Sequence, residues 1–155
     1  MVIRMGIVAE PALTPMLEDP DDYRPNSRLA LVVDPGGPAG RVDSFCLIFE
    51  EVAAGDRVPL HTHPMDELVL VIEGTVEVTL GDRKYTATSG STVFIPAQVV
   101  HGHRNIGAMP LKIRAVFPGT KIEIKMVERN PAPGTEDKPP SHMVYDARTG
   151  EFWQV

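Results

Sequence analysis

Four of the five histidines in this 155-residue chain occur as two His-x-His pairs, His61 with His63 and His101 with His103. Side chains at positions i and i+2 of a β-strand point to the same face, so each pair would project together from an extended segment. Imidazole nitrogens are good ligands for borderline transition metals such as zinc, copper, nickel and iron. The pairing therefore predicts a metal site built by two strands.

Glu67 adds a carboxylate to the first pair. It follows His63 after Pro64, where a turn is expected, and it opens the apolar run 68–72. Three imidazoles and one carboxylate suit one divalent transition metal (Fe, Mn, Ni, Co, Cu or Zn) and leave one or two positions open for water, substrate or dioxygen. A lone histidine is usually an ordinary core or surface residue, but the pairing and the neighbouring carboxylate favour metal binding here.

The two histidine segments resemble the two sequence motifs of the cupin superfamily, one segment for each motif. The first motif is met at every position and reads Gly55-DRVPL-His61-T-His63-PMD-Glu67-LVLVIE-Gly74. The second reads Gly90-STVFI-Pro96-A-Gln98-VV-His101-GHR-Asn105, with Gln98 in place of a glycine. The resemblance covers residues 44–118. It implies one metal held by His61, His63, Glu67 and His101, and a homodimer joined through exchanged terminal strands.

His103 lies outside the motif positions but should face the barrel interior with His101. The ordinary imidazole pKa lies near neutral pH, so His103 is a candidate catalytic residue that donates or accepts a proton beside the metal. The alternative is that His103 orients another ligand through a hydrogen bond. Lys112 or Arg114 could also line the pocket and hold an anionic substrate, although such residues more often face solvent.

The elements that would position these residues are short strands separated by glycine and proline turns. No segment shows a sustained 3.6-residue period, so we expect an all-β, single-domain cupin fold, a double-stranded β-helix or jelly-roll-like barrel with extended terminal arms. The barrel should occupy residues 41–128. Strands are expected at 44–53, 66–73, 74–80, 83–88, 91–95, 99–104, 111–117 and 121–127.

The two ends of the chain are expected to be arms. Residues 1–40 contain six prolines and should be extended, with room for one edge strand at Leu29–Val33. Residues 129–155 begin with a proline- and glycine-rich stretch and end in a tail with Phe152 and Trp153. Because aromatic rings are costly to leave in water, this tail should pack on its own barrel or on a partner, and it could hold a small helix.

Composition narrows the classes of function. A net charge of −6 without a basic stripe opposes nucleic-acid binding, and no apolar run reaches the roughly 20 residues of a membrane helix. The single cysteine, Cys46, lies in an apolar run, which favours plain packing and suits a reducing cytoplasm. No signal-peptide pattern opens the chain. We therefore expect a cytoplasmic protein whose partner is a small molecule.

Two hypotheses follow for the function. The first is a metal-dependent enzyme acting on a small organic molecule, with a dioxygenase favoured and a Lewis-acid isomerase or decarboxylase as an alternative. The second is a non-catalytic protein that binds or senses a small molecule through the metal. A fold and its metal ligands do not determine the reaction, so both hypotheses stay open at this point.

Overall fold

The computed structural model describes residues 6–7, 11–16, 19–33 and 42–155, and within them every regular element is a β-strand. The strands are β1 (Thr14–Met16), β2 (Arg24–Val33), β3 (Phe45–Val52), β4 (Arg57–Thr62), β5 (Glu67–Glu73), β6 (Thr75–Leu80), β7 (Arg83–Thr88), β8 (Thr92–Ile95), β9 (His101–Asn105), β10 (Leu111–Pro118), β11 (Lys121–Met126), β12 (His142–Asp146) and β13 (Glu151–Gln154).

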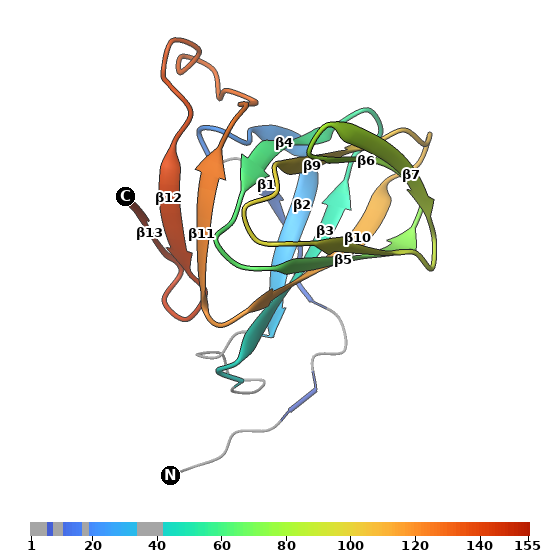
Figure 1. The fold of residues 1–155 in the computed structure, drawn as a ribbon, viewed down its shortest axis with the longest axis horizontal. Helices are drawn as coiled ribbons and strands as arrows, with labels where there is room; N and C mark the ends of the chain where they lie inside the picture. Colours follow the sequence, from blue (N-terminus) through green and yellow to red (C-terminus); the bar gives the residue numbers. More distant parts are fainter. Residues whose placement is uncertain (1–5, 8–10, 17–18, 34–41) are drawn as a thin grey trace.

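The strands form two antiparallel sheets (Figure 1). One sheet has the order β1-β2-β3-β10-β5-β8 and the other the order β13-β12-β11-β4-β9-β6-β7. Neighbours in each sheet are often distant in sequence, as where β10 lies between β3 and β5. This crossing pattern is that of the expected double-stranded β-helix. The all-β class predicted from the short strands is confirmed.

One end of the barrel is filled by apolar side chains from both sheets. Its buried members come mainly from the inward positions of β5, β6, β8 and β10, and the alternation of buried with more exposed residues along these strands matches a two-residue period. The cluster comprises Val52, Val69, Val71, Val76, Val78, Val93, Ile95, Leu111 and Ile113. Its burial supplies the main hydrophobic stabilisation of the barrel.

The N-terminal arm adds strands to the barrel's own sheet. β2 pairs with β3 from Arg28 onward and so covers the strand expected at Leu29–Val33. β1 pairs along its other side, so β1 and not β2 forms the edge of the sheet. Pro25 lies before this pairing begins, where a missing N–H removes no ladder hydrogen bond. A second cluster, built around Cys46, Phe117 and Ile122, fills the interior near β11.

The C-terminal tail continues the other sheet, as the red strands beside β11 show (Figure 1). β12 pairs with β11 over five residues, and β13 folds back along β12. The ring of Phe152 packs on that of Tyr145 at 4.8 Å between centroids, and Lys121 lies over Trp153. The small helix considered for the tail is therefore wrong, because the tail forms this β-hairpin. Phe152 stays 61% exposed and Trp153 41% exposed on it.

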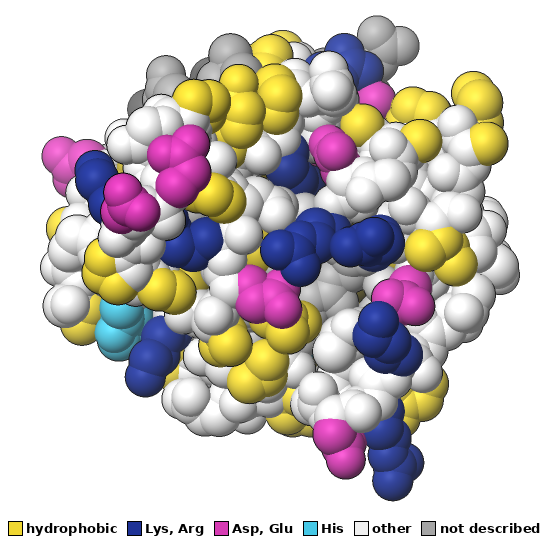
Figure 2. Space-filling model, turned by 90° about the horizontal axis from the view of Figure 1, so that it is seen from above, with side chains coloured by type: hydrophobic (Ala, Val, Ile, Leu, Met, Phe, Trp, Pro, Cys, Tyr) yellow, Lys and Arg dark blue, Asp and Glu magenta, His cyan; other side chains and the backbone are white. Residues whose placement is uncertain are grey.

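The described residues contain no helix of the length and apolarity that a membrane span requires. Figure 2 shows acidic and basic side chains interspersed over one face of the molecule, with apolar groups between them and no continuous basic stripe on that face.

Candidate metal centre

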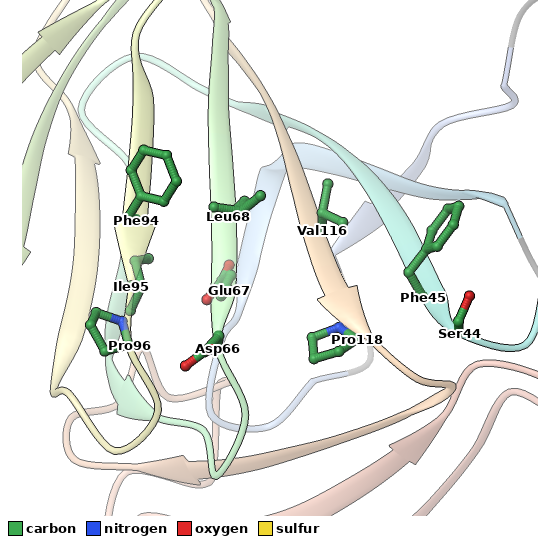
Figure 3. Close-up of a pocket in the computed structure, with 10 residues that line it drawn as sticks. All are labelled: Ser44, Phe45, Asp66, Glu67, Leu68, Phe94, Ile95, Pro96, Val116 and Pro118. Atoms are coloured by element: carbon green, nitrogen blue, oxygen red, sulfur yellow. The ribbon is translucent and has the colours of Figure 1, made fainter.

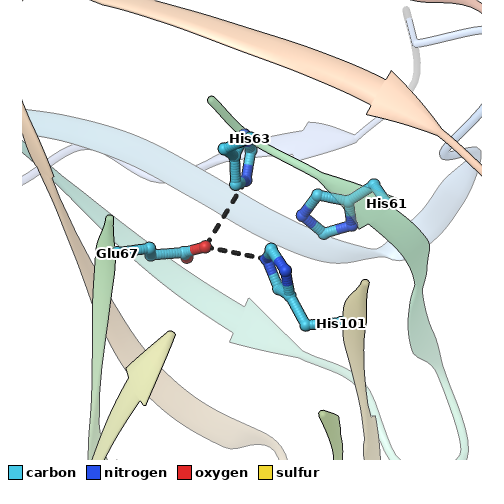
Figure 4. A group of neighbouring side chains, drawn as sticks. All are labelled: His61, His63, Glu67 and His101. Carbon is cyan, nitrogen blue, oxygen red and sulfur yellow. Dashed lines mark hydrogen bonds and ion pairs between the residues drawn. The ribbon is translucent and has the colours of Figure 1, made fainter. Parts of the chain in front are cut away.

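Three strands bring the four predicted ligands together in the barrel interior (Figure 4). His61 and His63 come from β4 and the turn after it, Glu67 begins β5, and His101 begins β9. All four side chains are buried, and their ligating atoms lie within 4.8 Å of one another. The separation is close to the roughly 4.2 Å between opposite ligands of one metal bound at about 2.1 Å each.

A bulge in β4 sets the register of this cluster. Val58 pairs with His103, and His61 pairs with His101. Between these two pairs β4 therefore contains one residue more than β9. The extra residue places His61 directly opposite His101. Gly102 allows the close approach of the strands, because a Cβ there would lie 2.7 Å from the carbonyl oxygen of Val58.

Backbone carbonyls orient all three imidazoles in the same way. Nδ1 lies 2.7 Å from the Pro59 oxygen in His61, 2.7 Å from the Glu123 oxygen in His63 and 2.8 Å from the Val99 oxygen in His101. A carbonyl oxygen can only accept, so each Nδ1 carries the proton and donates it. In the neutral ring this leaves a lone pair on each Nε2, as a metal-binding histidine requires.

The Nε2 atoms meet Glu67 in an arrangement that needs a cation. Nε2 of His101 lies 2.9 Å, and Nε2 of His63 3.4 Å, from the same carboxylate oxygen. Nε2 of His63 is also buried without a hydrogen-bond partner among the described residues. Neutral imidazole lone pairs would repel a carboxylate at such distances. Either protons or one metal ion must lie between them.

Two pKa shifts describe the charges at this cluster. Burial is the main cause that lowers the pKa of His61 well below its usual value, and the charges of His101 and His63 lower it further. Burial alone would raise the pKa of Glu67, but contacts with His101 and His63 outweigh it and hold that pKa below its usual range. An ionised Glu67 carboxylate in a cluster whose His61 imidazole resists protonation matches the charge and donor atoms of a divalent transition-metal site.

His103 lies beside the cluster but outside it. Its side chain is buried, and Nε2 has no hydrogen-bond partner among the described residues. Burial, more than any neighbouring charge, lowers the pKa of His103 to about 4, so the ring is neutral at neutral pH. The charges of Glu67, His101, Arg24 and Asp22 also act on this pKa. His103 therefore lies within electrostatic range of both the metal cluster and the arginine of the N-terminal arm.

Arg24 is an interior residue that sequence reasoning missed. Its side chain is only 3% exposed and forms ion pairs with Asp22 and Glu50. Lys112 and Arg114, considered for the same region, are exposed instead: Lys112 pairs with Glu73, and Arg114 lies over the Phe49 ring. Two-residue alternation from the buried Val52 would have placed Glu50 inward, and a buried carboxylate calls for a cationic partner.

An apolar groove of about 520 Å³ lies on the outer face of the six-stranded sheet (Figure 3). Phe94, Leu68, Val116 and Phe45 form a row across β8, β5, β10 and β3. Ile72, at the end of the apolar run 68–72 in β5, is 39% exposed, and Phe94 in the adjacent strand is 70% exposed. Glu67, which belongs to the four-residue cluster, also lines this groove.

Comparisons with known proteins agree with this architecture. Residues 48–117 match the family model of the cupin domain. An uncharacterized protein of Methanocaldococcus jannaschii is 36% identical over 63 residues, which cover 40% of this chain and 50% of that protein. A quercetin 2,3-dioxygenase of Bacillus subtilis is 29% identical over 113 residues, which cover 72% of this chain and 33% of the enzyme.

Among solved structures, the polyketide cyclase RemF from Streptomyces resistomycificus superposes with a TM-score of 0.59 at 23% identity. The superposition covers 86% of this chain and 85% of the cyclase, and at this identity it supports the fold alone. The chain spans half or less of the length of the two relatives matched by sequence.

Proposed function

We propose, from the premise that this chain is a member of the cupin superfamily, that it is a metal-dependent enzyme acting on a small organic molecule, with dioxygenase-like oxidation the favoured reaction. The observation that carries the proposal is the convergence of four buried donor groups whose lone pairs share one point. The relative named as a quercetin 2,3-dioxygenase matches 72% of this chain and favours oxidation over other cupin reactions.

The four residues would have distinct roles in holding the metal. His61, His63 and His101 would each bind through Nε2, with the tautomer fixed by the carbonyl that accepts from Nδ1. Glu67 would supply the one negative charge and leave a site of net charge +1. A divalent iron, manganese, nickel, cobalt, copper or zinc ion bound there would supply Lewis acidity and, for the redox-active metals, one-electron chemistry.

We assign His103 the role of the residue that handles protons at the substrate. Its Nε2 has no hydrogen-bond partner among the described residues, so in the tautomer with the proton on Nδ1 it can accept a hydrogen bond from a hydroxyl group of the substrate and then take the proton along that bond. Apolar side chains, among them the Phe117 ring packed 5.0 Å from His63, keep water away from this end of the cavity. Acceptance of the proton by His103 would raise the electron density of the substrate before oxidation.

Metal analysis combined with oxygen uptake tests the proposal. The full chain is purified without added metal, the bound element is determined by mass spectrometry, and oxygen consumption is followed with catechols, flavonols, diketones and thiols. We expect one redox-active ion per chain and uptake that depends on one of these substrate classes. A His142→Ala variant is the matched control, because His142 pairs with Glu123 outside the four-residue cluster.

Other outcomes would overturn the proposal in distinguishable ways. Tightly bound zinc with no oxygen uptake would remove the dioxygenase and leave a Lewis-acid enzyme or a non-catalytic small-molecule binder. A His61→Ala chain that kept its metal would show that the ligand assignment is wrong. Full turnover in a His103→Phe chain would remove His103 from the reaction.

We also propose that the protein is a homodimer. The row of apolar side chains that lines the outer groove spans four strands and includes Phe94, which is 70% exposed. Two copies could cover these rows with each other, as a two-fold interface pairs one patch with itself. Light scattering should give twice the chain mass for the wild type and the chain mass for Phe94→Asp. A monomeric wild type would remove this proposal.

A cytoplasmic location is proposed from the cysteine. Cys46 is fully buried, and burial raises the pKa of its thiol to about 11, so this thiol is unreactive. With one cysteine the chain cannot form an internal disulfide, which suits a reducing compartment. Fractionation of cells that express the full-length gene would check this location.

A further inference from the structure

Two buried polar atoms of the barrel interior lack a hydrogen-bond partner among the described residues and are not metal ligands: Nη1 of Arg24 and Nε2 of His103. Arg24 is 3% exposed and His103 6%, so water outside the protein cannot satisfy them. A buried donor left without a partner destabilises a fold by about 1–3 kcal/mol. A ligand that met both atoms would remove this cost.

Arg24 enters the interior beside the apolar cluster. It donates from Nε and Nη2 to Asp22 and from Nη2 to Glu50, which leaves only Nη1 open. Glu50 on β3 pairs with Ile113 on the adjacent strand β10, and Ile113 belongs to the apolar cluster. Residues paired across a sheet share a face, so the head of Arg24 is drawn to the inner surface of the six-stranded sheet.

His103 reaches the same region from the opposite sheet. His103 on β9 pairs with Val78 on the adjacent strand β6, and Val78 also belongs to that apolar cluster. His103 also lies two residues from His101, so the Cα atoms of the two histidines are about 6.6 Å apart along β9 and their side chains leave the strand on the same face. A ligand that bound the metal through one end could therefore extend one ring width toward His103 and Arg24.

The charges around Arg24 define which ligand fits. Two carboxylates, Asp22 and Glu50, surround one guanidinium, so this ion-pair group carries an excess negative charge. A further carboxylate or phosphate placed there would be repelled by this group in a medium of low dielectric constant. An uncharged oxygen meets no such repulsion and can accept from Nη1 while its hydroxyl hydrogen, where present, is donated to His103.

We propose that Arg24 and His103 form a second recognition point that binds the uncharged hydroxyl or carbonyl end of a metal-chelating ligand and discriminates against an anionic end. The inference rests on the proposed function, since the other end of the ligand binds the metal. It assigns the N-terminal arm a part in selecting substrates. Two carboxylates beside Arg24 then serve to exclude anionic molecules as well as to hold the arginine.

Three hydroxypyranones with the same chelating head test the proposal. Kojic acid ends in a hydroxymethyl group, allomaltol in a methyl group and comenic acid in a carboxylate. Their affinities are measured by calorimetry on zinc-loaded full chain, after zinc binding itself has been titrated. We expect kojic acid to bind at least about 10-fold more tightly than allomaltol, because its hydroxyl gains hydrogen bonds with Arg24 and His103, and more tightly than comenic acid by at least as much.

Two variants assign the difference to the two residues. His103→Phe keeps the ring volume and removes the nitrogen, and Arg24→Lys keeps the charge that holds Asp22 and Glu50 but removes Nη1. Each should lower the affinity for kojic acid to that of allomaltol and leave allomaltol unchanged. Arg57→Lys is the matched control, because Arg57 is 36% exposed and pairs with Glu128 at the surface.

The outcomes separate this inference from the metal site. Zinc binding with equal affinity for kojic acid and allomaltol would overturn the inference and leave the metal site intact; a buried water joining the two atoms would give that result. Comenic acid binding most tightly would overturn the exclusion of anions. Failure of zinc to bind at all would overturn both the proposed function and the inference.

Discussion

Two buried arginines show how differently this chain treats its interior charges. Arg129 uses all five of its N–H donors: it pairs with Asp21 and donates to Pro20, Thr135 and Lys138. Arg24 pairs with Asp22 and Glu50 but leaves Nη1 without a partner among the described residues. Both are at least nine-tenths buried, so exposure does not explain the difference.

The contrast separates a structural network from a binding region. Arg129 joins the N-terminal arm to the loop before β12, where every polar group that it meets is satisfied, so it has nothing left to bind. Arg24 and the nearby His63 and His103 keep donors and lone pairs open inside the barrel. Open polar groups reduce stability and are available to a metal or ligand.

Replacement of Arg129 by methionine should have the largest effect on folding. The change would leave the Asp21 carboxylate buried without its partner, which typically destabilises a protein by about 3–5 kcal/mol. Urea unfolding measures the loss, and metal affinity should stay unchanged. Arg148→Met is the control, since Arg148 is 42% exposed and should lose less than about 1 kcal/mol. An equal loss of unfolding free energy in the Arg129 and Arg148 variants would show that Arg129 has no special structural role.

Replacement of His61 by alanine should show the opposite behaviour. Loss of a ligand should weaken metal binding more than the roughly 10–100-fold typical of an outer partner, because the donor atom itself is gone. The unfolding free energy of the metal-free chain should change far less, since removal of one imidazole relieves the crowding of lone pairs around Glu67. A metal-free His61→Ala chain as unstable as Arg129→Met would break the division between the two regions.

The Asp21 carboxyl makes the structural network sensitive to acid. Burial would raise the pKa of Asp21, but hydrogen bonds from Ser141 and Arg129 and the charge of Arg129 lower it overall. The unfolded chain therefore binds this proton first as pH falls. The stability that the carboxylate contributes is present above its ordinary pKa near 3.8 and is lost as pH falls below it.

Comparison of the wild type with Asp21→Asn measures this contribution. The variant should be less stable by about 2 kcal/mol at pH 7, the value of a hydrogen bond to a charged group. The difference should narrow when the pH is lowered from 5 to 3, since the wild type alone loses the contribution. Thermal unfolding at a series of pH values checks it, and a constant difference would show that the charge of Asp21 plays no part.

The sequence predicted which side chains cluster as metal ligands inside the barrel. It did not predict which residues of the terminal arms contact the barrel interior. The two-residue period and the motif spacing predicted the barrel strands and gathered His61, His63, Glu67 and His101 as candidates, because both depend on local geometry. The buried position of Arg24 could not be predicted from sequence. The neighbouring Pro20 and Pro25 indicate an extended arm but do not show which part of the barrel the arm contacts. Its partner Glu50 is 26 residues away, a pairing that only the folded register reveals.

Gln98 offers the smallest test, at the edge of the binding region. It is the only non-glycine residue with positive φ in the described part of the chain, at 68°, and it stands where the second cupin motif has glycine. Its N–H donates to the His63 carbonyl at 2.7 Å, so the strained residue supports the turn after β4 that carries the ligand His63. The left-handed conformation destabilises a residue with a Cβ by about 1–2 kcal/mol.

Replacement of Gln98 by glycine should raise the unfolding free energy by about 0.5–1 kcal/mol, because relief of the strain exceeds the extra entropy of glycine in the unfolded chain. The control is Ala97→Gly, at a neighbour without positive φ, which should lose about 0.5–1 kcal/mol. Metal affinity should not change in either variant, since both keep the N–H donors. A gain in stability accompanied by weaker metal binding would instead show that the strain at Gln98 holds His63 in place.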